Sequence, residues 1–292
     1  MRKSAEKFNT TRLRRSAFAA VMMCLILLSV LSAATFAWFS SNHMVGTSRV
    51  TGRIAAENAE LLLSSTGGAA FRGSGEADII QTNSADCEFL TPVSTADLVN
   101  FVSSTAVGEG YASYFTPVKN ESGYFRGRVY VMAKVTGGAE NASVALYLDE
   151  SEQAGGAIVR EDGEDGLILS AARLGLIFDD DPGTAVILRL SEDGADGRAM
   201  NTMLDGAVME EGSVLDSSGD ELKAVPDPSV PIGDYTVSDD EGFPRQPIFT
   251  APANRIIPVD VYFYLEGCDP DCTEAIAFDG SELHLAFYGV LS

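Results

Sequence analysis

The chain has 292 residues and a mass of 30.9 kDa, enough for one large or two modest domains. Its hydrophobic share of 46% and charged share of 21% exclude a disordered polyelectrolyte, and four cysteines are too few for a disulfide-dense miniprotein. The 20 basic and 42 acidic residues give a net charge of -22, which argues against nucleic acid as a partner.

The N-terminal residues 1–37 predict an exported chain. They hold six basic residues and one acid, and an uncharged apolar run occupies residues 17–39. Positive charge before an apolar segment is typical of a signal peptide or a signal anchor, with the rest of the chain outside the cytoplasmic membrane. The run is long enough to span a bilayer as one hydrophobic helix, so cleavage after Ala34 or Ala37 and retention in the membrane both remain open.

The exported part, residues 38–292, is predicted to be a single domain of strands. Residues 50–63 are compatible with a long strand or with a helical turn, and residues 94–102 carry a helix start signal. Apolar and other residues then alternate along 128–135 and again along 144–148. These two runs, joined through glycines, predict a β-hairpin.

The pattern continues toward the C-terminus. Residues 167–178 and 184–190 predict a second couple of strands around an acidic turn. The clearest pair of strands is expected at 259–265 and 283–287, joined by an acidic connection. Residues 194–258 are rich in Pro, Gly and Asp, which predicts a surface insertion. Many strands without a long amphipathic helix favour an all-β fold, an antiparallel jelly-roll-like β-sandwich after one N-terminal hydrophobic helix.

The sequence offers little for catalysis. His43 and His284 are its only histidines, and the common hydrolase and nucleotide-binding motifs are missing. We therefore expect no enzymatic activity and no cofactor, with a surface metallopeptidase that uses His284 as a remaining alternative.

An acidic turn after residues 259–265 combines carboxylates with two cysteines. Hard cations bind several oxygen ligands, so this turn is a candidate for weakly bound calcium, although it does not match the spaced calcium loop. The candidate ligands are Glu266, Asp269, Asp271 and Glu274. Cys268 and Cys272 could form a short disulfide or stay reduced.

Two stretches resemble a known family. One is the end of the leader, Ala33-Ala34-Thr35-Phe36-Ala37-Trp38-Phe39-Ser40-Ser41, with Val50-Thr51-Gly52-Arg53-Ile54 after it. The other runs from strand 259–265 through Glu266-Gly267-Cys268-Asp269-Pro270-Asp271-Cys272 to strand 283–287. They are similar to the TasA/camelysin group of exported Gram-positive proteins. The resemblance implies a jelly-roll subunit that is exported through a dedicated signal peptidase and assembled into biofilm-matrix fibres.

In such fibres the N-terminal segment of one subunit completes the sheet of the next, which pairs an open strand edge. Carried onto this chain, the donor is residues 38–50, and its partners are further copies or related matrix proteins. The expected assembly residues are Trp38, Phe39, Val45 and Val50. If the leader is retained, the chain is instead a membrane-anchored adhesion or carbohydrate-binding sandwich that makes contact through Tyr235 or Phe243.

Overall fold

The computed structural model divides the chain into two units. Of residues 1–42 it describes only Met22 and Met23, which are helical. In the second unit the described residues are 49–56, 58–83, 90–106, 113–136, 142–151, 154, 156, 158–161, 167–191, 207–210, 213–216, 221–222, 227–237, 246–269, 271–272 and 281–291. Within this part of the chain, no helix combines the length and the apolar character needed to cross a membrane. Apart from the two methionines, the predicted leader lies outside the described residues.

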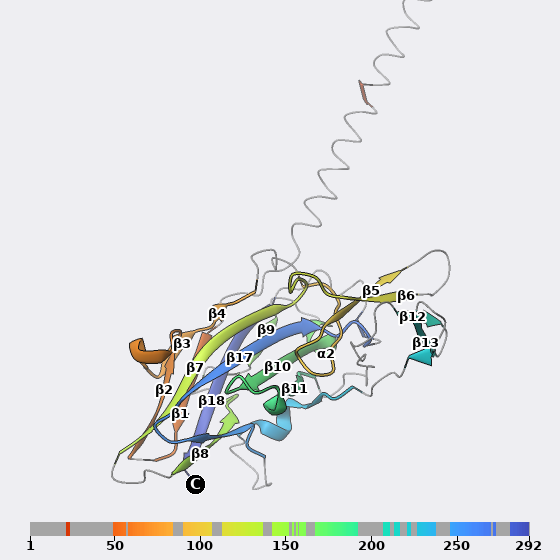
Figure 1. The fold of residues 1–292 in the computed structure, drawn as a ribbon. Coiled ribbons are helices and arrows are strands. Elements are labelled where there is room, and N and C mark those ends of the chain that lie inside the picture. Colours follow the sequence, from red (N-terminus) through yellow and green to blue (C-terminus); the bar gives the residue numbers. More distant parts are fainter. Residues whose placement is uncertain are drawn as a thin grey trace, which may run out of the picture. The chain divides into compact units, whose positions relative to one another are not determined.

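The second unit is an all-β fold with two large mixed sheets (Figure 1). The first sheet has the strand order β16-β8-β18-β1-β3, and β9 also pairs with β18. Its strands are β1 (Arg49–Ile54), β3 (Glu76–Asp78), β8 (Ser143–Leu148), β9 (Val159–Glu161), β16 (Phe249–Pro252) and β18 (Ser281–Leu291).

The second sheet has the order β15-β11-β10-β17-β7-β2, with β4 also on β7. Its strands are β2 (Ala59–Ser64), β4 (Ile80–Gln81), β7 (Phe125–Val135), β10 (Ala172–Phe178), β11 (Val186–Arg189), β15 (Val230–Pro231) and β17 (Ile256–Leu265). A smaller sheet contains β14 (Glu221–Leu222), β13 (Ser213–Asp216), β12 (Ala207–Glu210), β6 (Ser113–Pro117) and β5 (Val102–Ala106). Short helices are η1 (Gly68–Ala70), α2 (Leu167–Ala171), η3 (Pro182–Thr184) and η4 (Ile232–Tyr235).

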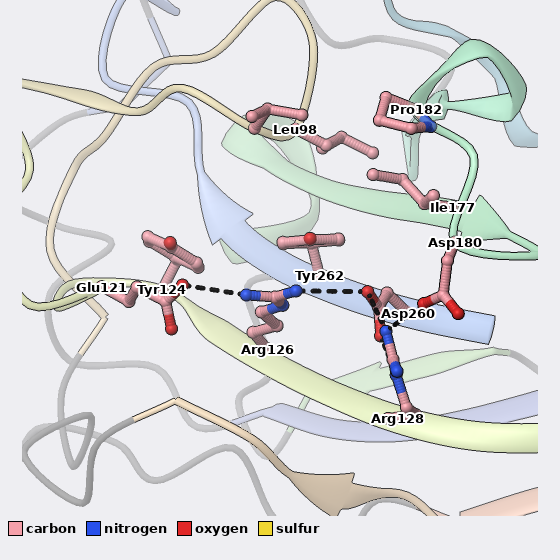
Figure 2. A pocket seen from close by; sticks show the side chains of 11 residues that line it. Leu98, Glu121, Tyr124, Arg126, Arg128, Ile177, Asp180, Pro182, Asp260 and Tyr262 are labelled. Atoms are coloured by element: carbon pink, nitrogen blue, oxygen red, sulfur yellow. Dashed lines mark hydrogen bonds and ion pairs between the residues drawn. The ribbon is translucent and has the colours of Figure 1, made fainter. Parts of the chain in front are cut away.

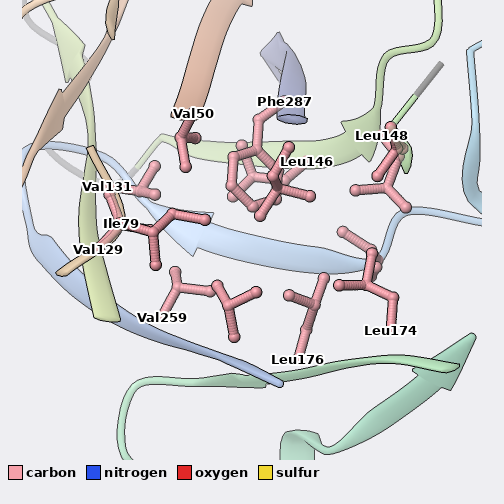
Figure 3. Close-up of a cluster of buried hydrophobic side chains, with 14 of the residues drawn as sticks. Val50, Ile79, Val129, Val131, Leu146, Leu148, Leu174, Leu176, Val259 and Phe287 are labelled. Atoms are coloured by element: carbon pink, nitrogen blue, oxygen red, sulfur yellow. The ribbon is translucent and has the colours of Figure 1, made fainter. Parts of the chain in front are cut away.

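One hydrophobic core joins the two large sheets (Figure 3). Every second residue of β7 points into it, as the alternating burial of that strand shows. The first sheet contributes Val50, Leu146 and Phe287, and the second contributes Val129, Leu174, Leu176 and Val259. Full burial of one such side chain stabilises the fold by about 1.5–3 kcal/mol, so the shared core holds the sheets face to face.

The expected strands are confirmed except at residues 167–171, which form the short helix α2 before β10. Several expected pairings are wrong. Strands β7 and β8 do not form a hairpin, because β7 pairs with β2, β4 and β17 whereas β8 pairs with β16 and β18. The two C-terminal strands, β17 and β18, likewise belong to different sheets. Only the couple of β10 and β11 pairs as expected, with Leu174 opposite Leu188. The large sheets are also not purely antiparallel, since β1 with β18 and β11 with β15 are parallel pairs.

Residues 50–63 contain two strands, β1 and β2, that lie in different sheets. The predicted surface insertion at 194–258 is wrong at its C-terminal end, because it contains β16 of the first sheet and the beginning of β17. Strand β16 carries the fully buried Ala251, and Ile257 of β17 is buried too, so this part belongs to the hydrophobic core and not to a surface insertion.

The helix expected at residues 94–102 is absent, and a tight loop occupies this segment. The Thr95 hydroxyl accepts the N–H groups of Asp97 and Leu98, and the Asp97 carboxylate accepts those of Val99 and Asn100. Side-chain bonds of this kind compete with helical backbone bonds. The backbones of Ser94 and Val102 close the loop through two hydrogen bonds of 2.8 and 2.9 Å.

Candidate functional site

The expected assembly segment reaches the described part of the chain only at its end. Trp38, Phe39 and Val45 lie outside the described residues. Val50 lies in β1, is fully buried, and pairs with Leu285 of β18 on one side and Ala77 of β3 on the other. The last residue of the predicted donor is therefore part of the chain's own first sheet.

Strand β18 begins three residues before its pairing with β1. The parallel register starts at Arg49 opposite His284, whereas Ser281–Leu283 pair with β9. His284 donates its N–H to Ile158 on the β9 side. Because backbone groups alternate along a strand, the N–H and C=O groups of Ser281 and Leu283 point to the β1 side. On that side, none of the described strands pairs with these two residues.

The acidic turn after β17 is organised around an arginine. Asp269 accepts a hydrogen bond of 2.5 Å from Arg173 Nη2, and its other carboxylate oxygen accepts the N–H of Asp271. The side chains of Arg173 and Asp269 are fully buried. A guanidinium thus already neutralises one of the candidate calcium ligands.

Glu266 lies deep in the same turn. Its carboxylate accepts the Cys268 N–H, and burial raises its pKa to about 8. Glu274 lies outside the described residues, and those that are described include no group of three potential metal ligands. Calcium binding at this turn remains a prediction.

Cys268 and Cys272 are both free thiols in the structure. The backbone N–H of Cys272 donates to the Asp269 carbonyl and closes the turn between them. Burial is the main cause that raises the pKa of Cys268 to about 12 and that of Cys272 to about 11. Both groups are therefore protonated and weakly nucleophilic at neutral pH.

The residues of the two alternative functions are placed only in part. Tyr235 in η4 is partly buried against the main core and partly exposed, and Phe243 is outside the described residues. His284 is half-buried in the middle of the first sheet.

A cavity that the sequence analysis missed lies on the outer face of the second sheet (Figure 2). Neighbouring strands supply its polar wall, since Arg126 of β7 lies opposite Tyr262 of β17 and Arg128 lies opposite Asp260. We call it the arginine–tyrosine cavity; its volume is about 290 Å³. Residues that face outward from a strand lie two positions apart in the sequence. The spacing of Arg126 and Arg128, and of Asp260 and Tyr262, was therefore the sequence signal that could have indicated this site.

The Asp260 carboxylate fixes both arginines of the cavity. Arg128 donates to it through Nε at 2.5 Å and through Nη2 at 2.8 Å, and Arg126 donates through Nη2 at 3.2 Å. Two acids at the rim complete the network, Glu121 on Arg126 and Asp180 on Arg128. Burial raises the pKa of Tyr262 to about 12, so its phenol is neutral.

Comparison of the chain with protein-family models, with curated proteins and with solved structures found no match. The similarity to the TasA/camelysin group therefore remains an expectation from the two sequence stretches.

Proposed function

We propose that the chain is a non-enzymatic surface or matrix subunit, a jelly-roll sandwich that assembles with further copies by strand addition of its N-terminal segment. The observation that carries this proposal is the parallel pair of β1 and β18. It joins the first strand of the folded unit to the last one, with Val50 opposite Leu285. Backbone pairing of this kind needs no particular side chains on either strand and suits addition from another chain.

The backbone groups of Ser281 and Leu283, which no described strand pairs with on the β1 side, supply an acceptor for such a strand. Continued in the register of β1, residues 46–48 of a donor lie opposite Ser281–Leu283. Leu283 is fully buried, so the neighbouring position is already part of an apolar environment. Trp38 and Phe39, which come about ten residues before β1 in the sequence, are the anchors of the donor.

Charge opposes this assembly. The chain after residue 37 carries most of the 42 acidic residues, and copies of such a body repel one another. At an ionic strength of 0.1 M, salt largely screens the repulsion between charges that are more than about 10 Å apart. Assembly of the processed chain should therefore become faster as the salt concentration rises.

The test compares residues 38–292 with residues 49–292, which lack donor residues 38–48 but keep all of β1. We expect only the longer chain to form polymers in light scattering and electron microscopy, and Trp38→Ala with Phe39→Ala to slow their growth. Ser281→Pro removes one N–H of the acceptor at the first position of β18, where proline is tolerated, and should also stop growth. Equal assembly of both chains, or a longer chain that stays monomeric at high salt, would contradict the proposal.

A further inference from the structure

We propose that the arginine–tyrosine cavity binds a neutral sugar ring, either free or at the end of a glycan chain. This site is separate from strand addition, because it lies on the outer face of the second sheet, whereas the acceptor is in the first sheet. Its four features are a fixed polar wall, an apolar wall, a strained loop and charged groups that are already paired with one another.

The polar wall is fixed before any ligand arrives. Asp260 has a nearly buried side chain and holds both guanidinium groups through three hydrogen bonds of 2.5–3.2 Å. Charge-assisted and bidentate bonds of this type set orientation as well as energy. Arg126 also stacks over the ring of Tyr262, with 5.5 Å from the guanidinium carbon to the ring centre. A ligand therefore meets donors and acceptors that do not need to be ordered.

The apolar wall faces these groups across the cavity (Figure 2). It contains Leu98, Ile177 and Pro182, and the ring of Tyr124 adds an aromatic surface. Tyr124 is itself held by a stacked Phe101, with 3.9 Å between the ring centres. A sugar ring has C–H groups on its faces and hydroxyls around its edge, so it matches a site with both kinds of surface. The volume of about 290 Å³ is at the lower end for small-molecule sites and suits one ring with water.

Leu98 adopts a strained backbone conformation at this wall. Its φ is +59°, in the left-handed region that bulky residues rarely adopt. The hydrogen bond from its N–H to Thr95 holds the loop, and Gly175 beneath it provides the space for its side chain. Strain of this kind persists where the surrounding structure enforces it, and it concentrates at functional sites.

Charge selects a neutral ligand. Two guanidinium groups face three carboxylates, those of Asp260, Glu121 and Asp180, in a chain with a net charge of -22. The two exposed rim carboxylates repel an anion. The two guanidinium groups repel a cation, and the carboxylates beside them are already bound to these arginines. Sugar hydroxyls can donate to the rim carboxylates and accept from the guanidinium groups without adding charge.

The experiment is calorimetric titration of residues 38–292 with glucose, galactose, N-acetylglucosamine and their disaccharides, with glucuronic acid and glucosamine as charged probes. We expect at least one neutral sugar to bind, and the two charged probes to bind about tenfold more weakly. Stronger binding of a disaccharide than of its monosaccharide would identify a glycan end as the source. The double variant Glu121→Gln with Asp180→Asn should weaken the neutral sugar about tenfold, the loss of about 1.4 kcal/mol of charged hydrogen bonding. Asn suits position 180, whose φ is +55°.

Two controls separate binding in the cavity from other effects. Val99→Trp places a large ring at an exposed residue of the cavity wall and should abolish binding. Asp234→Asn removes an exposed acid in η4, outside the cavity, and should change nothing. The proposal is overturned if no neutral sugar binds, if a charged probe binds best, or if Val99→Trp leaves the affinity unchanged. Displacement of the sugar by a peptide of residues 38–50 would also overturn it, since the cavity would then be an assembly contact.

Discussion

Arg53 of β1 binds the carboxylate of Asp149, which follows β8 on the far side of β18. Arg53 donates through Nε to one carboxylate oxygen and through Nη2 to the other at 3.2 Å. Its guanidinium also lies over the ring of Tyr288, 4.8 Å from the ring centre, and donates to Ser151. The Asp149 side chain is fully buried. The clamp therefore ties the first strand of the unit to two other strands of its sheet.

Removing this clamp should destabilise the fold. Arg53→Ala leaves the Asp149 carboxylate buried without its charge partner, and we expect the free energy of unfolding in urea at neutral pH to fall by about 3 kcal/mol. Arg49→Ala is the matched control on the same strand. Its salt bridge to Glu76 joins side chains that are 53% and 47% exposed, so a loss under about 1 kcal/mol is expected. Equal losses in the two variants would show that Arg53 acts as a surface residue.

A second variant tests the packing under the arginine–tyrosine cavity. A Cβ at Gly175 would meet Leu98 Cδ2 at 2.4 Å, so Gly175→Ala must displace a buried side chain. We expect a loss of about 1–3 kcal/mol in the free energy of unfolding, together with a change in sugar affinity because Leu98 lines the cavity. In Gly75→Ala the new Cβ meets only the Gly52 carbonyl oxygen at 3.8 Å, and little change is expected. Unchanged stability of Gly175→Ala would mean that the loop above it moves freely.

Local patterns in the sequence were sufficient to predict the long core strands and one hairpin, but not the short strands, and residues 167–171 form a helix instead of a strand. Alternating burial along β7 follows from its own residues, and β10 and β11 are joined by a short acidic turn in which Asp179 and Asp180 take left-handed backbone angles. Asp tolerates that conformation, so the turn chemistry could be predicted from composition. The hairpin of β7 and β8 failed because alternation indicates which face is buried but not which strand is the neighbour.

The cavity could not be predicted from local sequence at all. Arg126 and Arg128 reach Asp260 across 134 and 132 residues of chain. Residues 94–102 were predicted to be a helix that follows Thr91-Pro92 and has Asp97 in its first turn. The carboxylate of Asp97 closes a tight turn instead, because side-chain acceptors that stabilise a helix start can also satisfy the backbone of a turn. Tertiary contacts favour the turn over the helix, because the Leu98 side chain fits into the space above Gly175 and the backbone of Ser94 pairs with that of Val102.

Glu266 should make the stability of the unit depend on pH. Burial raises its pKa from 4.5 to about 8, so the folded chain holds a proton that the unfolded chain has already released between these values. Stability from this group is therefore complete below about pH 4.5 and declines as the pH rises to 8, by up to about 1.4 kcal/mol per pH unit. Glu266→Gln keeps an acceptor for the Cys268 N–H and should flatten this decline. Urea melts of both chains from pH 5 to pH 9 measure it, and identical slopes would contradict the assignment to Glu266.

The thiols of Cys268 and Cys272, beside Glu266, should react only slowly with labelling reagents and oxidants as long as the unit is folded. Raised pKa values of about 12 for Cys268 and about 11 for Cys272 reduce the thiolate fraction, and the thiolate is the reactive form. In residues 38–292 with Cys87→Ser, we expect a thiol-specific dye to label both cysteines at least about a hundredfold more slowly in buffer than in urea. A disulfide between them should form when the unfolded chain is refolded under oxidising conditions, but not when the folded chain is treated with the same oxidant, because closure also begins with a thiolate. Mass spectrometry of the two samples distinguishes these cases, and rapid closure in the folded chain would show that the turn opens to solvent.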